Sequence, residues 1–155
     1  STSTPQYIAA LDYFTDHMGY HAIKPPWGKL VAVDVAKGDI LWSIPLGEYP
    51  ELVKMGIRNT GVENFGGMAV TKGGLIFIGA TEDSRFRAFD KTNGELLWEF
   101  EMDAPGFSSP TVYEIDGRQY VAIVAGGGGG RYRSPVTGPI GRRLHVFALP
   151  ESELQ

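Results

Sequence analysis

Apolar and polar positions along this chain alternate in short runs that glycine and proline interrupt. The runs are rich in Val, Ile, Phe, Tyr and Leu, and 21 glycines and 10 prolines separate them. Stretches with a helical period are missing, apart from one or two turns in YPELVKMG (49–56). Short apolar runs between turn residues are typical of strands, so the pattern predicts an all-β protein.

A sequence motif occurs twice within these predicted strands. LVAVDVAKGDILWSI (30–44) and FRAFDKTNGELLWEF (86–100) both contain A-x-D-x-x-x-G-x-x-x-W, at an offset of 56 residues. The positions are Ala32, Asp34, Gly38 and Trp42 in the first copy, and Ala88, Asp90, Gly94 and Trp98 in the second. A third copy begins at RLHVFALP (143–150) and stops before its turn.

The spacing of the motif predicts a hairpin. Its Asp ends one strand and caps the turn, a role that we favour over catalysis because it recurs in both copies. Its Gly supplies the positive φ that closes the loop, and its Trp needs a large slot and an acceptor for the indole N–H. The small Ala on the preceding strand leaves room for that ring.

Joining the motif to the strand pairs before it gives four-stranded units. One complete unit covers about 66–100, and most of another covers 108–149. Four-stranded antiparallel units at this spacing are typical of β-propeller blades. We therefore divide the chain into an inter-blade loop with the end of one blade (1–46), a connecting loop (47–63), a full blade (64–102) and a last, incomplete blade (106–150).

The length of the chain limits this architecture. The 155 residues hold only about two and a half blades, whereas a closed ring needs roughly 4–8. We expect a partial ring, the C-terminal part of a larger propeller, whose missing strand comes from the rest of the parent or from another chain. Without that strand, the unpaired backbone groups at its sheet edges could pair with strands of other molecules.

Composition excludes several classes of function. The net charge is −4 with scattered basic residues, which argues against nucleic acid as a partner. Cysteine is absent, which excludes disulfides and thiolate metal sites. His17 and His21 have the spacing of two ligands on a helix face, but Gly19 lies between them and no third ligand is apparent, so no metal site is assigned.

The order of the motifs resembles the late blades of dehydrogenases that use pyrroloquinoline quinone (PQQ), above all membrane-type glucose dehydrogenases and their sugar and polyol relatives. The segments that carry the resemblance lie at 24–52 (beginning KPPWG), 64–100 (beginning NFGG) and 117–129 (GRQYVAIVAGGGG). The family's tryptophan-docking motif usually has Thr before its Gly, where this chain has Lys37 and Asn93. The resemblance implies an eight-bladed propeller with PQQ and Ca²⁺ on its axis.

The same resemblance places two segments of this chain beside PQQ. Asn64 and Phe65, in ENFGG (63–67), would contact the cofactor; the alternative is a turn whose Phe packs between blades. Backbone at Gly128, Gly129 and Gly130 would approach the cofactor's carboxylates, since glycine has no Cβ; the alternative is a flexible loop. Related alcohol dehydrogenases carry a tryptophan where this chain has Gly130.

Arg131 and Arg133 follow the glycine run and offer charge for the PQQ carboxylates, although a solvated loop is the simpler interpretation. The family's catalytic Asp and Ca²⁺ ligands lie in earlier blades, and no counterpart occurs here. No catalytic or metal-binding residue is therefore assigned to this chain.

The implied parent is a periplasmic enzyme, in some relatives membrane-associated, that oxidises a sugar, polyol or alcohol and passes electrons to a quinone or a cytochrome. The expected partners of this chain are the remaining blades, or copies of itself. The rival hypothesis is a non-catalytic propeller module that binds proteins, because such modules carry the same docking repeats without a cofactor.

Overall fold

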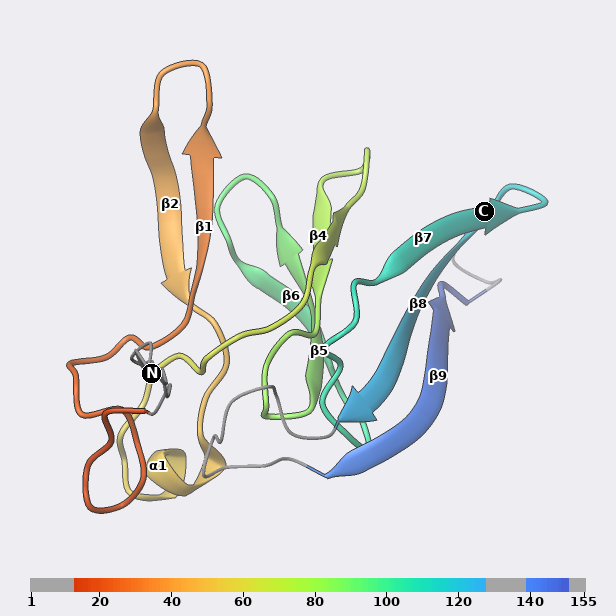
Figure 1. The fold of residues 1–155 in the computed structure, drawn as a ribbon. Helices are drawn as coiled ribbons and strands as arrows, with labels where there is room; N and C mark the ends of the chain where they lie inside the picture. Colours follow the sequence, from red (N-terminus) through yellow and green to blue (C-terminus); the bar gives the residue numbers. More distant parts are fainter. Residues whose placement is uncertain (1–12, 128–138, 151–155) are drawn as a thin grey trace, which may run out of the picture.

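The computed structural model describes residues 13–127 and 139–150. Over these residues the chain forms three antiparallel sheets in which every strand pairs with its neighbour in sequence (Figure 1). The sheets contain two, four and three strands in chain order. Their strands are β1 (Lys29–Asp34) and β2 (Asp39–Pro45); β3 (Met68–Val70), β4 (Leu75–Ile78), β5 (Arg85–Asp90) and β6 (Leu96–Glu101); and β7 (Thr111–Ile115), β8 (Arg118–Gly127) and β9 (Ile140–Ala148).

The prediction of all-β propeller blades is confirmed. The four-stranded sheet β3–β6 is a complete up-and-down blade, and β7–β9 is a blade with three described strands, with β9 at its edge. The sheets follow one another as an open series rather than a closed ring (Figure 1). A short helix, α1 (Pro50–Lys54), lies in the connection between the first two sheets, where the sequence predicted a helical turn.

Both copies of the repeated motif form the same hairpin. The Asp34 carboxylate accepts the N–H of Ala36 at 3.0 Å, and the Asp90 carboxylate accepts the N–H of Thr92 at 2.6 Å. Gly38 and Gly94 close the two turns with φ of +78° and +74°. Turn capping, predicted for the two aspartates, is confirmed.

The motif also connects neighbouring sheets. Trp42 pairs with Ala32 across β1 and β2, and its indole N–H donates to the carbonyl of Lys91 at 3.0 Å. Its ring lies over the turn of the next blade, where a Cβ built on Gly94 would come within 2.9 Å of Trp42 Cε3. The slot of Trp42 therefore depends on the glycine in the turn of the next blade.

Apolar clusters fill the spaces between the sheets. One lies between the first two sheets and includes Leu30, Ile76 and Phe89. A second joins the middle and last sheets, with Phe86 and Ile123 both nearly inaccessible to solvent. A third cluster holds the loops: Tyr49, Leu52 and Val62, with Tyr20 and Trp27 packed against them. Burial of these faces is the main force that stacks the blades.

Candidate functional site

Asn64 and Phe65 lie where the chain enters β3. The backbone of Asn64 forms a bridge with Thr81, and the N–H of Phe65 donates to the carbonyl of Ala80 at 2.8 Å. Asn64 is exposed, and among the described residues its side-chain amide has one long hydrogen bond, 3.4 Å to the carbonyl of Val62. The backbone here is fixed while a side-chain donor remains available to a ligand.

The glycines after Phe65 allow close packing against the start of the last blade. A Cβ on Gly66 would lie 2.5 Å from the carbonyl oxygen of Phe107, and one on Gly67 would lie 2.2 Å from Ser109 Oγ. The rings of Phe65 and Phe107 meet edge to face, with centroids 6.1 Å apart. Phe65 thus contacts the segment that leads into the last blade.

The KPPWG segment (24–28) packs against the stretch of chain that leads to Asn64. A Cβ on Gly28 would lie 1.9 Å from the carbonyl oxygen of Val62 and 2.8 Å from Asn64 Nδ2. The N–H of Trp27 donates to the carbonyl of Thr60 at 2.7 Å. Gly28 is therefore required by a crossing of two backbones, one of which carries Asn64.

The beginning of the glycine run is also explained by close packing. Gly127 has φ of +53°, and a Cβ there would lie 1.8 Å from the carbonyl oxygen of Pro139. Its N–H donates to the carbonyl of Pro105 at 2.9 Å. Gly128, Gly129 and Gly130, together with Arg131 and Arg133, lie outside the described residues.

A series of backbone hydrogen bonds places these segments near one another. Phe65 donates to Ala80, Ala80 donates to Gly106 at 2.8 Å, and Gly127 donates to Pro105 in the same linker. Asn64–Phe65 and the described start of the glycine run are thus attached to one short stretch between the two blades. The resemblance implied that both segments lie near the cofactor, but the sequence could not show that they share this stretch.

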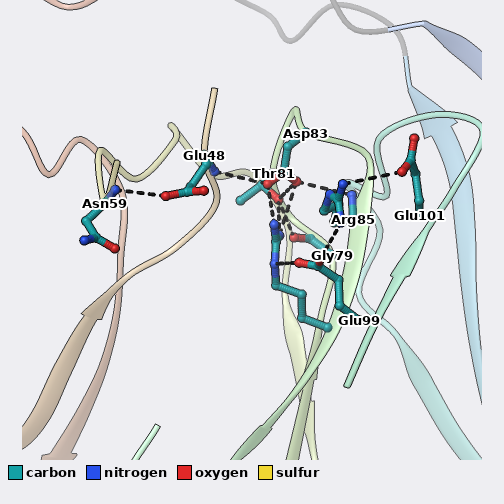
Figure 2. Close-up of polar contacts among 9 residues, drawn as sticks. Glu48, Asn59, Gly79, Thr81, Asp83, Arg85, Glu99 and Glu101 are labelled. Carbon is teal, nitrogen blue, oxygen red and sulfur yellow. Dashed lines mark hydrogen bonds and ion pairs between the residues drawn. The ribbon is translucent and has the colours of Figure 1, made fainter. Parts of the chain in front are cut away.

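Sequence reasoning missed a buried charge cluster next to this site (Figure 2). Arg87 is 6% exposed and binds the carboxylates of Asp83 and Glu99 and the hydroxyl of Thr81. Arg85 also pairs with Glu99, and that hydrogen bond raises the pKa of the Arg85 guanidinium. The available signal was Arg87 itself, a charged residue within β5, a strand buried on both faces.

A half-buried carboxylate, Glu63, precedes Asn64. It accepts the hydroxyl of Tyr13 at 3.0 Å, and His21 Nε2 lies 4.0 Å away. His21 packs against the rings of Tyr13 and Trp27. Within residues 13–127 and 139–150, no three His, Cys, Asp or Glu side chains gather as a metal site.

The described residues at this place could contact one edge of a ligand and do not enclose a whole binding site. They offer the exposed amide of Asn64 and the edge-on aromatic pair Phe65–Phe107. Carbonyl and carboxylate oxygens of a ligand accept hydrogen bonds from an amide of this kind. In the part of the chain that the structure describes, no helix is long and apolar enough to span a bilayer.

Antiparallel sheets stacked in this way define a section of a β-propeller. Residues 1–121 match the family described as glucose/ethanol/alcohol dehydrogenase, β-propeller domain, which is named for PQQ. The chain is 36% identical to the glycerol dehydrogenase large subunit of Gluconobacter thailandicus, covering 96% of this chain and 20% of that protein. It is 34% identical to quinoprotein glucose dehydrogenase A of Acinetobacter calcoaceticus, covering 95% and 18%.

Solved structures agree with these sequence matches. A europium-containing methanol dehydrogenase superposes with a TM-score of 0.58 at 26% identity, over 78% of this chain and 23% of that one. The quinohemoprotein alcohol dehydrogenase of Comamonas testosteroni gives 0.54 at 25% identity, over 77% and 16%. The chain belongs to the PQQ-dependent dehydrogenase family. It spans about a fifth of the length of the curated relatives above.

Proposed function

We propose that this chain is the C-terminal propeller section of a periplasmic dehydrogenase that oxidises a sugar, polyol or alcohol, and that it forms one wall of the PQQ funnel. The observation that carries the proposal is the shared attachment of Asn64–Phe65 and Gly127 to the linker at Pro105–Gly106. Membership of the family and the dehydrogenase names of the relatives support the activity. They favour it over a non-catalytic module that binds proteins.

When bound, PQQ supplies a quinone that accepts two electrons from the substrate. In our proposal Asn64 donates its side-chain amide to a cofactor oxygen, and Phe65 holds the ring edge that excludes water on one side. Backbone N–H groups of Gly128–Gly130 would face the cofactor carboxylates. The base that takes the substrate proton, and the Ca²⁺ ligands, would come from upstream blades, and electrons would leave to a quinone or a cytochrome.

The first test is titration of the folded chain with PQQ and Ca²⁺, following the absorbance of bound quinone. A second sample is a chimera in which the chain replaces the matching fifth of the G. thailandicus glycerol dehydrogenase large subunit. We expect Asn64→Ala and Gly129→Val to weaken PQQ binding about tenfold or more, since each removes or blocks one cofactor contact. Asn93→Ala is the matched control, because Asn93 is exposed in the hairpin turn between β5 and β6, where its side chain bonds to Glu95.

The two samples separate the outcomes. Binding that weakens in the Asn64 and Gly129 variants but not in Asn93→Ala supports the funnel wall. A folded chimera that binds PQQ equally well with all three variants contradicts the site. A folded chimera that binds no PQQ at all contradicts the proposed function and favours the non-catalytic module.

A further inference from the structure

The buried charge cluster next to the candidate site has Thr81 at its centre (Figure 2). Thr81 is completely buried. Its hydroxyl donates to the Asp83 carboxylate at 2.6 Å and accepts from Arg87 Nη1 at 3.1 Å. The carbonyl oxygen of Gly79 also lies 3.2 Å from this hydroxyl, and these three polar neighbours together restrict the Thr81 side chain to one rotamer.

Arg87 is itself fixed by two carboxylates. Its Nη2 binds Asp83, and its Nε binds Glu99 Oε2 at 2.8 Å. The side chains of Arg87 and Asp83 are only 7% and 3% exposed. Charge-assisted bonds in a forked arrangement, shielded from water, are strong and directional, so Thr81 is anchored through Arg87 and Glu99 to β5 and β6.

The cluster also holds the connecting loop that leads to the site. The N–H of Glu48 donates to Asp83 Oδ2 at 3.2 Å, and a Cβ on Gly47 would lie 2.9 Å from Thr81 Cγ2. One residue earlier, the carbonyl of Leu46 accepts the N–H of Val62 at 2.8 Å. The segment that carries Asn64 is thus fixed on its N-terminal side by contacts that begin at the same cluster.

On the other side, the backbone of Thr81 forms the bridge with Asn64, and Ala80 accepts the N–H of Phe65. We propose that Thr81, held by Arg87 and Asp83, is a positioning residue that sets the orientation of Asn64 and Phe65 toward the cofactor. This inference rests on the proposed function, because it assigns to the cluster the task of holding the funnel wall.

A purely stabilising cluster makes a different prediction from a positioning one. If Arg87 and Thr81 only stabilise the blade, their loss weakens the whole four-stranded sheet evenly. If they position the site, the loss appears first at the amide of Phe65, which depends on Ala80, while the centre of β5 keeps its protection. Amide hydrogen exchange measured residue by residue distinguishes local opening from global unfolding.

The variants are Thr81→Val, which removes the hydroxyl at nearly constant shape, and Arg87→Lys, which keeps the charge but loses the fork. Thr81→Ser retains the hydroxyl. The control is Asp90→Ala, which removes the turn cap at the opposite end of β5. We expect exchange of the Phe65 N–H to accelerate at least tenfold in Thr81→Val and Arg87→Lys, with little change in Thr81→Ser.

Equal acceleration at Phe65 and at the central β5 amides, or none at Phe65 in either variant, overturns the inference. PQQ titration of the same samples separates it from the proposed function. Faster exchange at Phe65 with unchanged PQQ affinity leaves the positioning role in place and contradicts the cofactor role of the site. Weaker PQQ binding in Asn64→Ala, with no effect of Thr81→Val on exchange or affinity, keeps the proposed function and rejects the positioning role.

Discussion

Gly94→Ala tests the contact that stacks the first two blades, and Gly38→Ala is its matched control. The two glycines occupy the same motif position, with nearly equal φ of +74° and +78°. They differ in their surroundings: a Cβ on Gly38 meets nothing within 4 Å, whereas one on Gly94 would lie 2.9 Å from Trp42 Cε3 and 3.0 Å from Cζ3. The pair therefore separates backbone conformation from interblade packing.

The expected magnitudes follow from these distances. An alanine in the left-handed region costs about 1–2 kcal/mol at either turn. At Gly94 the indole must also move by several tenths of an ångström, and overpacking of this kind adds about 1–3 kcal/mol. Movement of the ring weakens the bond from its N–H to Lys91, which is 3.0 Å long. We expect Gly94→Ala to lower the free energy of unfolding by about 1–3 kcal/mol more than Gly38→Ala does.

The assay is urea unfolding followed by far-UV circular dichroism, with each glycine variant measured in the wild-type and Trp42→Ala backgrounds. In the Trp42→Ala background the excess cost of Gly94→Ala should disappear, because the ring that it meets is gone. Two results would refute the proposed packing of Trp42 against Gly94. One is an equal loss of unfolding free energy in the two glycine variants, and the other is an extra loss in Gly94→Ala that persists in the Trp42→Ala background.

Three further predictions concern ionisable groups. Arg87→Met should lower the free energy of unfolding by about 3–5 kcal/mol in urea titration, because it leaves Asp83 buried without its cation; a loss below about 1 kcal/mol contradicts the buried pair. Burial raises the pKa of the Tyr49 hydroxyl, so the unfolded chain loses this proton first as pH rises above about 10. Above that pH the free energy of unfolding should fall by up to about 1.4 kcal/mol per pH unit. The fall should be smaller in Tyr49→Phe, which lacks the hydroxyl. The hydrogen bond from His145 lowers the pKa of Asp103, so its contribution is present above about pH 4 and lost as pH falls; hydrogen exchange of β9 should show this acid-induced opening in wild type and not in Asp103→Asn.

The sequence alone determined the hairpins and the blades. Asp34 and Asp90 cap turns, Gly38 and Gly94 close them, and the apolar runs between them form strands, because each of these features depends on a few neighbouring residues. The family could likewise be identified from motifs in fixed order. Such features can be read from the sequence because the residues that produce them are close together along the chain.

The tertiary structure decided what the glycines and charges are for. Gly28 and Gly66 resemble ordinary turn glycines in the sequence, but each is required by a backbone from a distant segment. Arg87 gives no sign in the sequence that Asp83, Glu99 and Thr81 surround it, because the partners lie on different strands and on a loop. Packing between segments far apart along the chain sets these contacts, and only the folded blades bring those segments together.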